Sequence, residues 1–235
     1  MKILFHGNSI STPQQFLDDV YRVPYIHGLF VEVAKTKDDR IVILNPDSNQ
    51  RLAVQKINNY TFQETKDSNF ILLEDMMRYF QQIKKRLVIS ALIGTGMLTF
   101  KEVDAYTTAL ADIVNEYPDI DVSVCSLSHA LIMNLKSKLK KAKIGVILEP
   151  ANLNYIDVDF YIFSANMLDA KILRQQDRNG KESMISLCSW TGLQQTMNFF
   201  RDDETKQILT EEQIDRITLI GYYPEIIHRS IQDIQ

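Results

Sequence analysis

The sequence predicts one domain over residues 1–235, an α/β fold of the (β/α)8 TIM-barrel class with a small hairpin excursion after the second strand. Three observations support this fold. Short runs rich in Val, Ile and Phe alternate with longer amphipathic stretches along the chain. These runs number eight, which is the strand count of such a barrel. They are apolar nearly throughout, as strands covered on both faces require.

A doubly wound open sheet is the competing architecture. It usually brings a glycine-rich turn after the first strand, and residues 5–12 lack the repeated glycines. The barrel is therefore favoured, and its expected strands can be named. They cover residues 2–5, 30–34, 87–91, 121–125, 144–148, 160–163, 184–188 and 217–220. A further apolar run, residues 40–44, is expected to pair with the second strand as a hairpin.

Helix signals fill the segments between the strands. Pro13 suits the first position of a helix, and residues 72–85 carry apolar side chains at helical spacing. Thr99 and Glu102 form a capping box, and Ser128 can cap the helix that follows it. The remaining signals are residues 166–176, residues 192–202 and a capping-box pattern at Thr210 and Gln213.

Composition and charge exclude several classes of protein. The net charge of -4 does not favour general electrostatic binding to nucleic acid. The basic run 136–143 is interpreted as the solvated end of a helix, with an anion-binding patch as the alternative. Cys125 and Cys188 lie in apolar runs and are expected to be small buried side chains. The first apolar run is too short for a signal peptide and no stretch approaches a membrane span, so a cytoplasmic location is expected.

Polar residues at the expected strand ends mark the place where a barrel carries its chemistry. They form a ring of polar side chains that contains few carboxylates, whereas a divalent cation requires several oxygen ligands. The ring includes His6, Glu32, Arg51, Ser90, Glu149, Ser164, Trp190 and Tyr222.

Short motifs follow one another along almost the whole chain. They are His6-Gly7, Pro13, Glu32, Thr36-Lys37-Asp38, Asp47, Arg51, Trp190-Thr191 and Tyr223-Pro224. In this order they resemble the glycerophosphodiester phosphodiesterase family. The resemblance implies a (β/α)8 barrel with a small insertion after an early strand. It also implies a Ca²⁺ or Mg²⁺ ion that is held by acidic residues. Two histidines would be catalytic, and basic residues would bind the phosphate group of the substrate.

This chain differs from the family at the positions that the resemblance implies for metal binding and catalysis. Two of the three implied metal acids are Phe30 and Ser90, and only Glu32 remains acidic. Asn45 stands in place of the second histidine, so His6 lacks an acid–base partner typically worth about 10²–10⁴-fold in rate. The replaced phosphate-binding positions are Gly7 and Leu92.

Two functions follow. The first is a catalytically impaired or inactive relative that acts by binding a small phosphoester, another small molecule or a protein partner. The alternative is an active phosphoric diester hydrolase that cleaves glycerophosphodiesters to glycerol 3-phosphate and an alcohol with a rebuilt metal site.

The residues assigned to the site each have a structural alternative. His6 is the catalytic candidate, or an inherited hydrogen-bonded histidine. Glu32 and Glu149 are the metal candidates, although Glu32 can instead pair with Arg51 or a lysine. Arg51, Trp190 and Tyr222 are the substrate-binding candidates, although a lone Trp at a barrel mouth more often packs the pocket wall.

Overall fold

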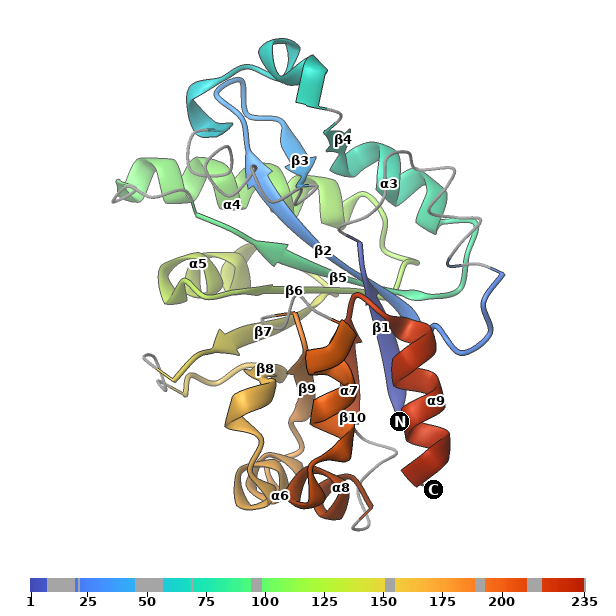
Figure 1. The fold of residues 1–235 in the computed structure, drawn as a ribbon. Helices are drawn as coiled ribbons and strands as arrows, with labels where there is room; N and C mark the ends of the chain where they lie inside the picture. Colours follow the sequence, from blue (N-terminus) through green and yellow to red (C-terminus); the bar gives the residue numbers. More distant parts are fainter. Residues whose placement is uncertain are drawn as a thin grey trace.

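Eight parallel strands close into a barrel, as the sequence predicts (Figure 1). The computed structural model describes residues 1–7, 20, 22–44, 57–68, 70–93, 99–150, 155–188, 193–210 and 217–234. The barrel closes because β1 pairs in parallel with both β2 and β10. The strands are β1 (Lys2–His6), β2 (Gly28–Lys35), β5 (Arg86–Ala91), β6 (Val122–Ser126), β7 (Lys143–Leu148), β8 (Phe160–Ser164), β9 (Glu182–Ser186) and β10 (Ile217–Gly221).

The predicted hairpin excursion is confirmed. β3 (Ile41–Ile43) pairs antiparallel with β2, and its turn contains Asp39 at a φ of 60°. A second short strand, β4 (Ile71–Leu72), pairs with β3. The helix expected over residues 72–85 is shorter, α3 (Leu73–Phe80). It begins after Leu72 because Leu72 is held in the sheet opposite Val42, and it ends at Phe80 rather than at residue 85. Two 3₁₀ helices complete the excursion, η1 (Ile57–Asn59) and η2 (Gln63–Ser68).

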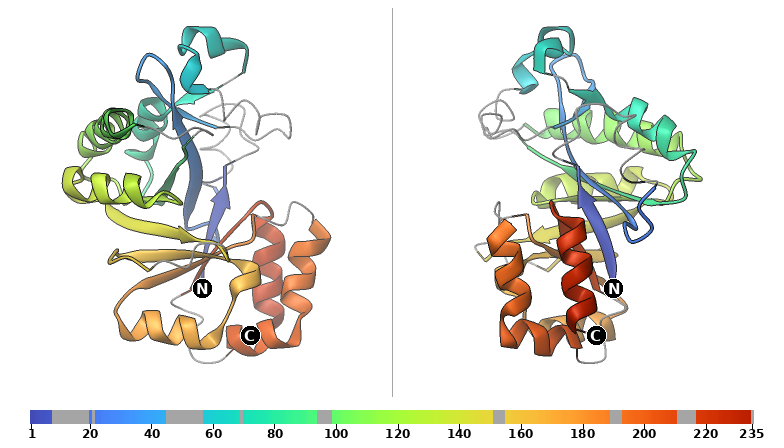
Figure 2. Two further views of the ribbon diagram at one scale, coloured as in Figure 1. Left: turned by 90° about the vertical axis from the view of Figure 1, so that its left-hand side faces the viewer. Right: turned by 45° about the vertical axis from the view of Figure 1, so that its right-hand side comes forward.

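Helices lie on the outside of the barrel (Figure 2). The capping box is present at the start of α4 (Phe100–Asn115), where Glu102 Oε2 accepts from Thr99 N at 2.7 Å. Ser128 Oγ accepts from Leu131 N at 3.4 Å and so caps α5 (His129–Lys138). The other helices are η3 (Ala165–Met167), α6 (Ala170–Arg178), α7 (Leu193–Arg201), α8 (Asp203–Thr210) and α9 (Pro224–Ile234).

Three of the helix predictions concern the connection between β7 and β8, the residues around Thr210, and the segment after β1. The described residues of the connection between β7 and β8, 149–150 and 155–159, form no helix. Thr210 is the last residue of α8, where its hydroxyl donates to Lys206 O at 2.8 Å. Pro13 and Gln213 lie outside the described residues.

The barrel interior is filled by side chains rather than open. Its buried members are Leu4, Phe30, Val88, Cys125, Phe160, Ile162, Met184 and Ile220, and Ile147 and Cys188 pack against them. Phe160 occupies the space beside Gly145, since a Cβ added at Gly145 would lie 2.2 Å from Phe160 Cε2. The largest apolar cluster joins the outer faces of β2, β5 and β6 to α3, α4 and α5. The interior therefore forms a plug that separates the two ends of the barrel.

Candidate functional site

The mouth of the barrel lies above the apolar plug, at the carboxyl ends of the strands. Side chains two residues apart on a strand face the same side. The residues two positions beyond the plug on each strand therefore form its next layer, which we call the upper layer. The upper layer consists of His6, Glu32, Ser90, Leu127, Glu149, Ser164, Ser186 and Tyr222.

His6 is buried between two aromatic rings. Only 1% of its surface is exposed. Its ring centroid lies 4.9 Å from that of Phe30 and 4.7 Å from that of Tyr222. These three residues meet because β1 stands between β2 and β10 in the closed barrel. The predicted catalytic histidine therefore sits at the mouth, where an aromatic residue covers it on each side.

Glu32 is a half-buried carboxylate directly above the plug. It pairs in register with Ser90 on the neighbouring strand, which pairs with Cys125 in turn. Burial raises the pKa of the Cys125 and Cys188 thiols, and the Glu32 charge raises both further. Both cysteines therefore stay as neutral thiols.

The two cysteines are free, and Cys125 is fully buried, as the sequence predicts. Cys188 is only half-buried at the mouth. Its Sγ lies 3.8 Å from the carbonyl oxygen of Ile220. An apolar environment keeps both thiols poorly reactive.

Phe30 and Ser90 stand where the family resemblance implies metal-binding acids. Phe30 is 5% exposed and belongs to the apolar plug. Ser90 is fully buried, and its Oγ makes no hydrogen bond of ordinary geometry with a described residue. Neither side chain carries the negative charge that a hard cation requires.

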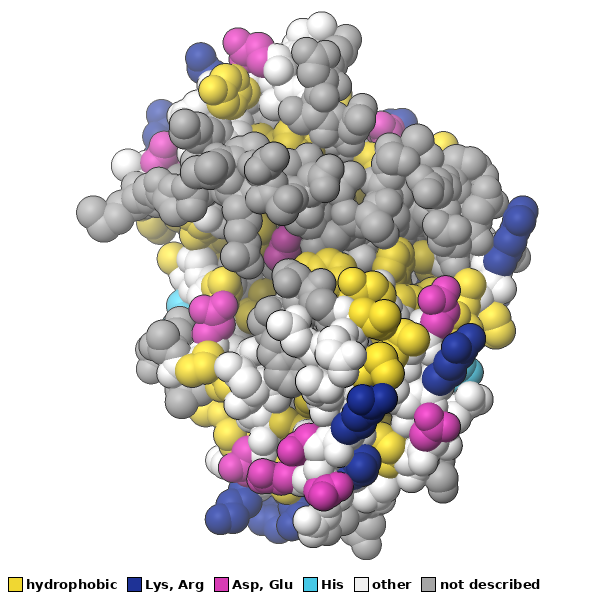
Figure 3. Space-filling view, in the orientation of Figure 1, with side chains coloured by type: hydrophobic (Ala, Val, Ile, Leu, Met, Phe, Trp, Pro, Cys, Tyr) yellow, Lys and Arg dark blue, Asp and Glu magenta, His cyan; other side chains and the backbone are white. Residues whose placement is uncertain are grey.

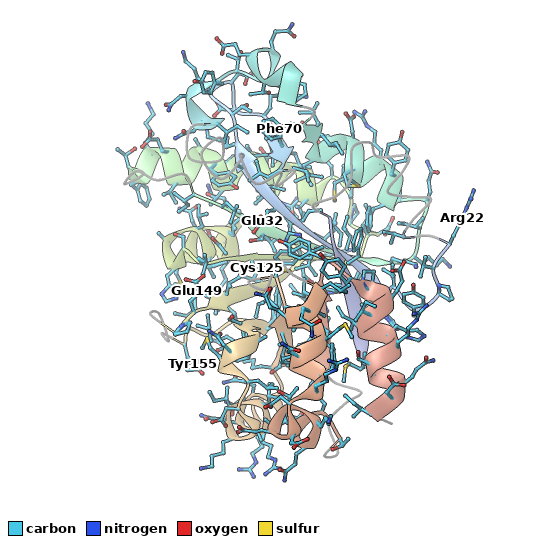
Figure 4. The ribbon with its side chains drawn as sticks, in the orientation of Figure 1. Arg22, Glu32, Phe70, Cys125, Glu149 and Tyr155 are labelled. Carbon is cyan, nitrogen blue, oxygen red and sulfur yellow. The ribbon has the colours of Figure 1, made fainter. Side chains whose placement is uncertain are left out.

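Glu149, the second proposed metal ligand, is exposed at the end of β7. Figure 4 shows it at the edge of the barrel, whereas Glu32 lies over the centre. Within the described ranges, no three His, Cys, Asp or Glu side chains are grouped so that they could hold a metal ion. A Ca²⁺ ion takes six to eight oxygen ligands, so the described part of the mouth does not fit such an ion.

Several predicted site residues cannot be placed. Asn45, Asp47, Arg51 and Trp190 lie outside the residues that the structure describes. Their assigned roles remain predictions. Tyr222 is described and lies at the mouth, half-buried against His6. Leu92, in place of a phosphate-binding lysine, packs against the apolar cluster of the hairpin excursion.

Sequence reasoning missed Leu127 and, among the polar members of the upper layer, Ser186. Its hydroxyl accepts from Cys188 N at 3.3 Å, and it pairs in register with Ser164. Alternation from Met184 would have identified it, because both residues face the barrel axis. Three serine hydroxyls and one tyrosine thus share the upper layer with a single imidazole and two carboxylates. The upper layer contains no lysine or arginine, so its charged side chains are carboxylates and its other polar groups are hydroxyls and one imidazole.

Comparison with known proteins identifies the fold. No family model matches the sequence, and no curated protein matches it. A glycerophosphodiester phosphodiesterase structure from Parabacteroides distasonis is 14% identical, with a TM-score of 0.68 over 99% of this chain and 98% of that one. Another from Thermotoga maritima is 17% identical, with a TM-score of 0.65 over 97% of each chain. This chain has the glycerophosphodiester phosphodiesterase fold.

A third similar structure contains a ligand. It is a phosphodiesterase from Oleispira antarctica in complex with the product sn-glycerol-3-phosphate. It is 12% identical, with a TM-score of 0.68 over 99% of this chain and 97% of that one. The resemblance that the sequence motifs predict is thus confirmed at the level of the glycerophosphodiester phosphodiesterase fold. None of the described helices is long and apolar enough to cross a membrane.

Proposed function

We propose that this protein is a glycerophosphodiester phosphodiesterase-like barrel that binds a small polar molecule in its mouth and has lost the family's metal-dependent hydrolysis. One observation carries the proposal. Phe30 places an aromatic ring against His6 at a position where the resemblance implies a metal-binding acid. The ring excludes water and offers no oxygen ligand. A single half-buried carboxylate, Glu32, is left above the plug.

The composition of the upper layer supports a hydroxyl-bearing ligand. Ser90, Ser164, Ser186 and Tyr222 can each donate and accept a hydrogen bond. The product glycerol 3-phosphate in the Oleispira antarctica structure supports a ligand of that size. Under this proposal Arg51 and Trp190 complete the site, with Arg51 holding any phosphate group.

Two further observations support a small-molecule partner rather than a nucleic acid. The face in Figure 3 mixes lysine and arginine with aspartate and glutamate among its described residues. The net charge of the chain is -4. We also place the protein in the cytoplasm, because Cys125 and Cys188 are free thiols and reduced cysteines are usual there.

A second candidate is a phosphoric diester hydrolase of lipid metabolism. It is favoured by the position of His6 and Glu32, which both belong to the upper layer. His6 would act as general acid or base. A Ca²⁺ or Mg²⁺ ion would polarise the phosphoryl oxygen, held by Glu32, Glu149 and residues of the mouth loops.

One experiment separates the two candidates. Ca²⁺ and Mg²⁺ are titrated into metal-free protein by calorimetry. In parallel, release of glycerol 3-phosphate from a panel of glycerophosphodiesters is measured for the wild type, His6→Ala and Glu32→Gln. We expect no saturable metal binding and no turnover above the His6→Ala background. Metal binding together with turnover that both variants abolish would establish the hydrolase instead.

A further inference from the structure

The opposite end of the barrel, below the plug, contains a cavity of about 660 Å³. Its volume lies in the range of about 300–1,000 Å³ that is usual for small-ligand sites. We call it the lower cavity. It opens beside the first residues of the strands, at the end where the chain begins (N in Figure 1). The charged residues that matter here are Lys2, Lys84, Arg86, Asp121, Lys143 and Glu182.

A buried ion pair forms one wall of the lower cavity. Arg86, only 8% exposed, binds the Glu182 carboxylate through Nη1. Its Nε and Nη2 donate to Ser123 Oγ at 3.1 and 2.8 Å, and its guanidinium lies 5.6 Å from the centre of the Phe160 ring. Thr218 Oγ1 donates to Glu182 Oε1 at 3.3 Å. The charge of Glu182 is thus already matched by the charge of Arg86.

Two more cations surround the same carboxylate. Lys143 Nζ lies 3.8 Å from Glu182 Oε2. Burial raises the pKa of the Glu182 carboxyl, but Arg86, Lys143 and Lys2 outweigh burial and leave the pKa below its usual value. Lys2 lines the same cavity as Glu182, and it makes no ion pair with any described residue. Three positive side chains face one negative one.

The other titratable groups of the lining do not cancel this excess. Lys85 Nζ donates to the carbonyl oxygens of Val20, Val23 and Ile26. Its ammonium group is therefore already hydrogen-bonded within the protein. Burial lowers the pKa of His27, and the charges of Lys2 and Lys85 lower it further, so His27 stays neutral.

The lining as a whole is also positive. Asp119 and Asp121 are exposed on the loop before β6, and Lys84 makes no ion pair among the described residues. Five lysine or arginine side chains face three carboxylates in this lining, whereas the whole chain carries -4.

We propose that the lower cavity binds a small molecule through a phosphate group placed between Lys2 and Lys143, beside the Arg86–Glu182 pair. A phosphate oxygen would accept from both ammonium groups, and charge-assisted hydrogen bonds of this kind are about twice as strong as neutral ones. The half-buried side chains of Tyr117 and Ile120 also line the cavity and can contact an organic portion of the ligand. This site is separate from the mouth, and no step of the diester chemistry depends on it.

The test is calorimetric titration of inorganic pyrophosphate into the full chain without divalent cations, with inorganic phosphate as the weaker probe. We expect saturable binding at one site that weakens as salt is raised, because the recognition is electrostatic. The double variant Lys2→Gln/Lys143→Gln should weaken binding by about tenfold or more. The matched control, Lys37→Gln/Lys206→Gln, removes two lysines that do not line the lower cavity and should change the affinity by less than about twofold.

Two results would overturn the proposal. One is no saturable heat for the wild type at millimolar pyrophosphate. The other is equal weakening in the two double variants, which would show a diffuse charge effect. Glu32→Gln should bind pyrophosphate like the wild type, which separates this test from that of the mouth. Circular dichroism of each variant checks that the fold is intact, and selective protection of Lys2 and Lys143 from acetylation by bound pyrophosphate provides a second readout in the wild type.

Discussion

The two ends of the barrel differ in how they use polar side chains. Below the plug, Arg86, Glu182, Ser123 and Thr218 are joined in one hydrogen-bonded and ion-paired network. Above it, the upper layer has hydroxyls, one imidazole and two carboxylates, and no lysine or arginine. The family resemblance places chemistry at the upper end, yet the buried Arg86–Glu182 pair, with Lys143 Nζ 3.8 Å from the same carboxylate, lies at the lower end.

The difference between the two ends separates the residues that stabilise the barrel from the positions where the family resemblance implies chemistry. A barrel can keep its shape with neutral residues at the mouth, because the plug and the outer clusters supply the burial. Removing acids from the mouth also removes mutual repulsion between carboxylates. The neutral side chains of Phe30 and Ser90, where the resemblance implies acids, are therefore compatible with the barrel fold. The buried pair at the lower end has the opposite property, since removing Glu182 leaves Arg86 without a carboxylate partner and removing Arg86 leaves Glu182 with only the more distant Lys143.

The largest predicted effect tests that property. Arg86→Ala leaves the Glu182 carboxylate without its main partner at a site that is only 20% exposed. We expect a loss of about 3 kcal/mol in the free energy of unfolding, measured by urea denaturation. Ser90→Ala at the upper end should cost less than about 1 kcal/mol, because its hydroxyl loses no hydrogen bond to a described residue.

A matched control exists on α3. Arg78 pairs with Asp75 at 3.0 Å on the surface, and Arg78→Ala should change stability by less than about 0.5 kcal/mol. The double variant Arg86→Ala/Glu182→Ala should be more stable than the sum of the two single changes predicts. Additive effects would show that Arg86 and Glu182 do not stabilise each other, and the contrast between the two ends would fail.

A smaller effect is expected from pH at the lower end. The folded pKa of Glu182 lies below its unfolded value, so its contribution to stability is complete above the unfolded pKa, about 4.5. It is lost as the pH falls through the folded pKa. Glu182 is partly exposed, so solvent screening limits this contribution to about 1 kcal/mol or less.

Stability against urea, measured from neutral pH down to about pH 3, checks this prediction. Below the unfolded pKa the wild type should lose more stability than Glu182→Gln does. Parallel plots of unfolding free energy against pH for the two proteins would mean that the pKa of Glu182 does not change on folding. Glu32→Gln serves as the comparison variant from the mouth.

The sequence predicts the scaffold well, and the reason is physical. Runs such as residues 87–91 and 217–220 are apolar on both faces, so local pattern is enough to find them. The lower pair could not be found in this way, because Arg86 and Glu182 are 96 residues apart and meet only when the barrel closes.

The same holds at the mouth. Motif resemblance points to His6, but the rings of Phe30 and Tyr222 reach it only through the neighbours of β1. Side chains that meet across strands depend on register and closure, which no local pattern carries. In the basic run 136–143, Lys136 forms a surface ion pair with Asp157, as expected for a solvated helix end, whereas Lys143 is the first residue of β7 and lines the lower cavity.

The smallest predicted effect concerns the thiols at the mouth. Burial is the main cause of the raised pKa of Cys188, and the charge of Glu32 is a lesser one. At about pH 8, iodoacetamide should therefore alkylate Cys188 in the native protein at least about tenfold more slowly than in the urea-unfolded chain. Glu32→Gln should speed the reaction by less than about threefold, because it removes the charge and leaves the burial.

Mass spectrometry of tryptic peptides measures both cysteines in one sample. Cys125, fully buried beneath Ser90, is the internal control and should react only on unfolding. A native Cys188 that reacts as fast as the unfolded chain would show that water reaches the plug from the mouth. In that case the upper end would be an open polar site, and the Phe30 ring would not exclude water from it.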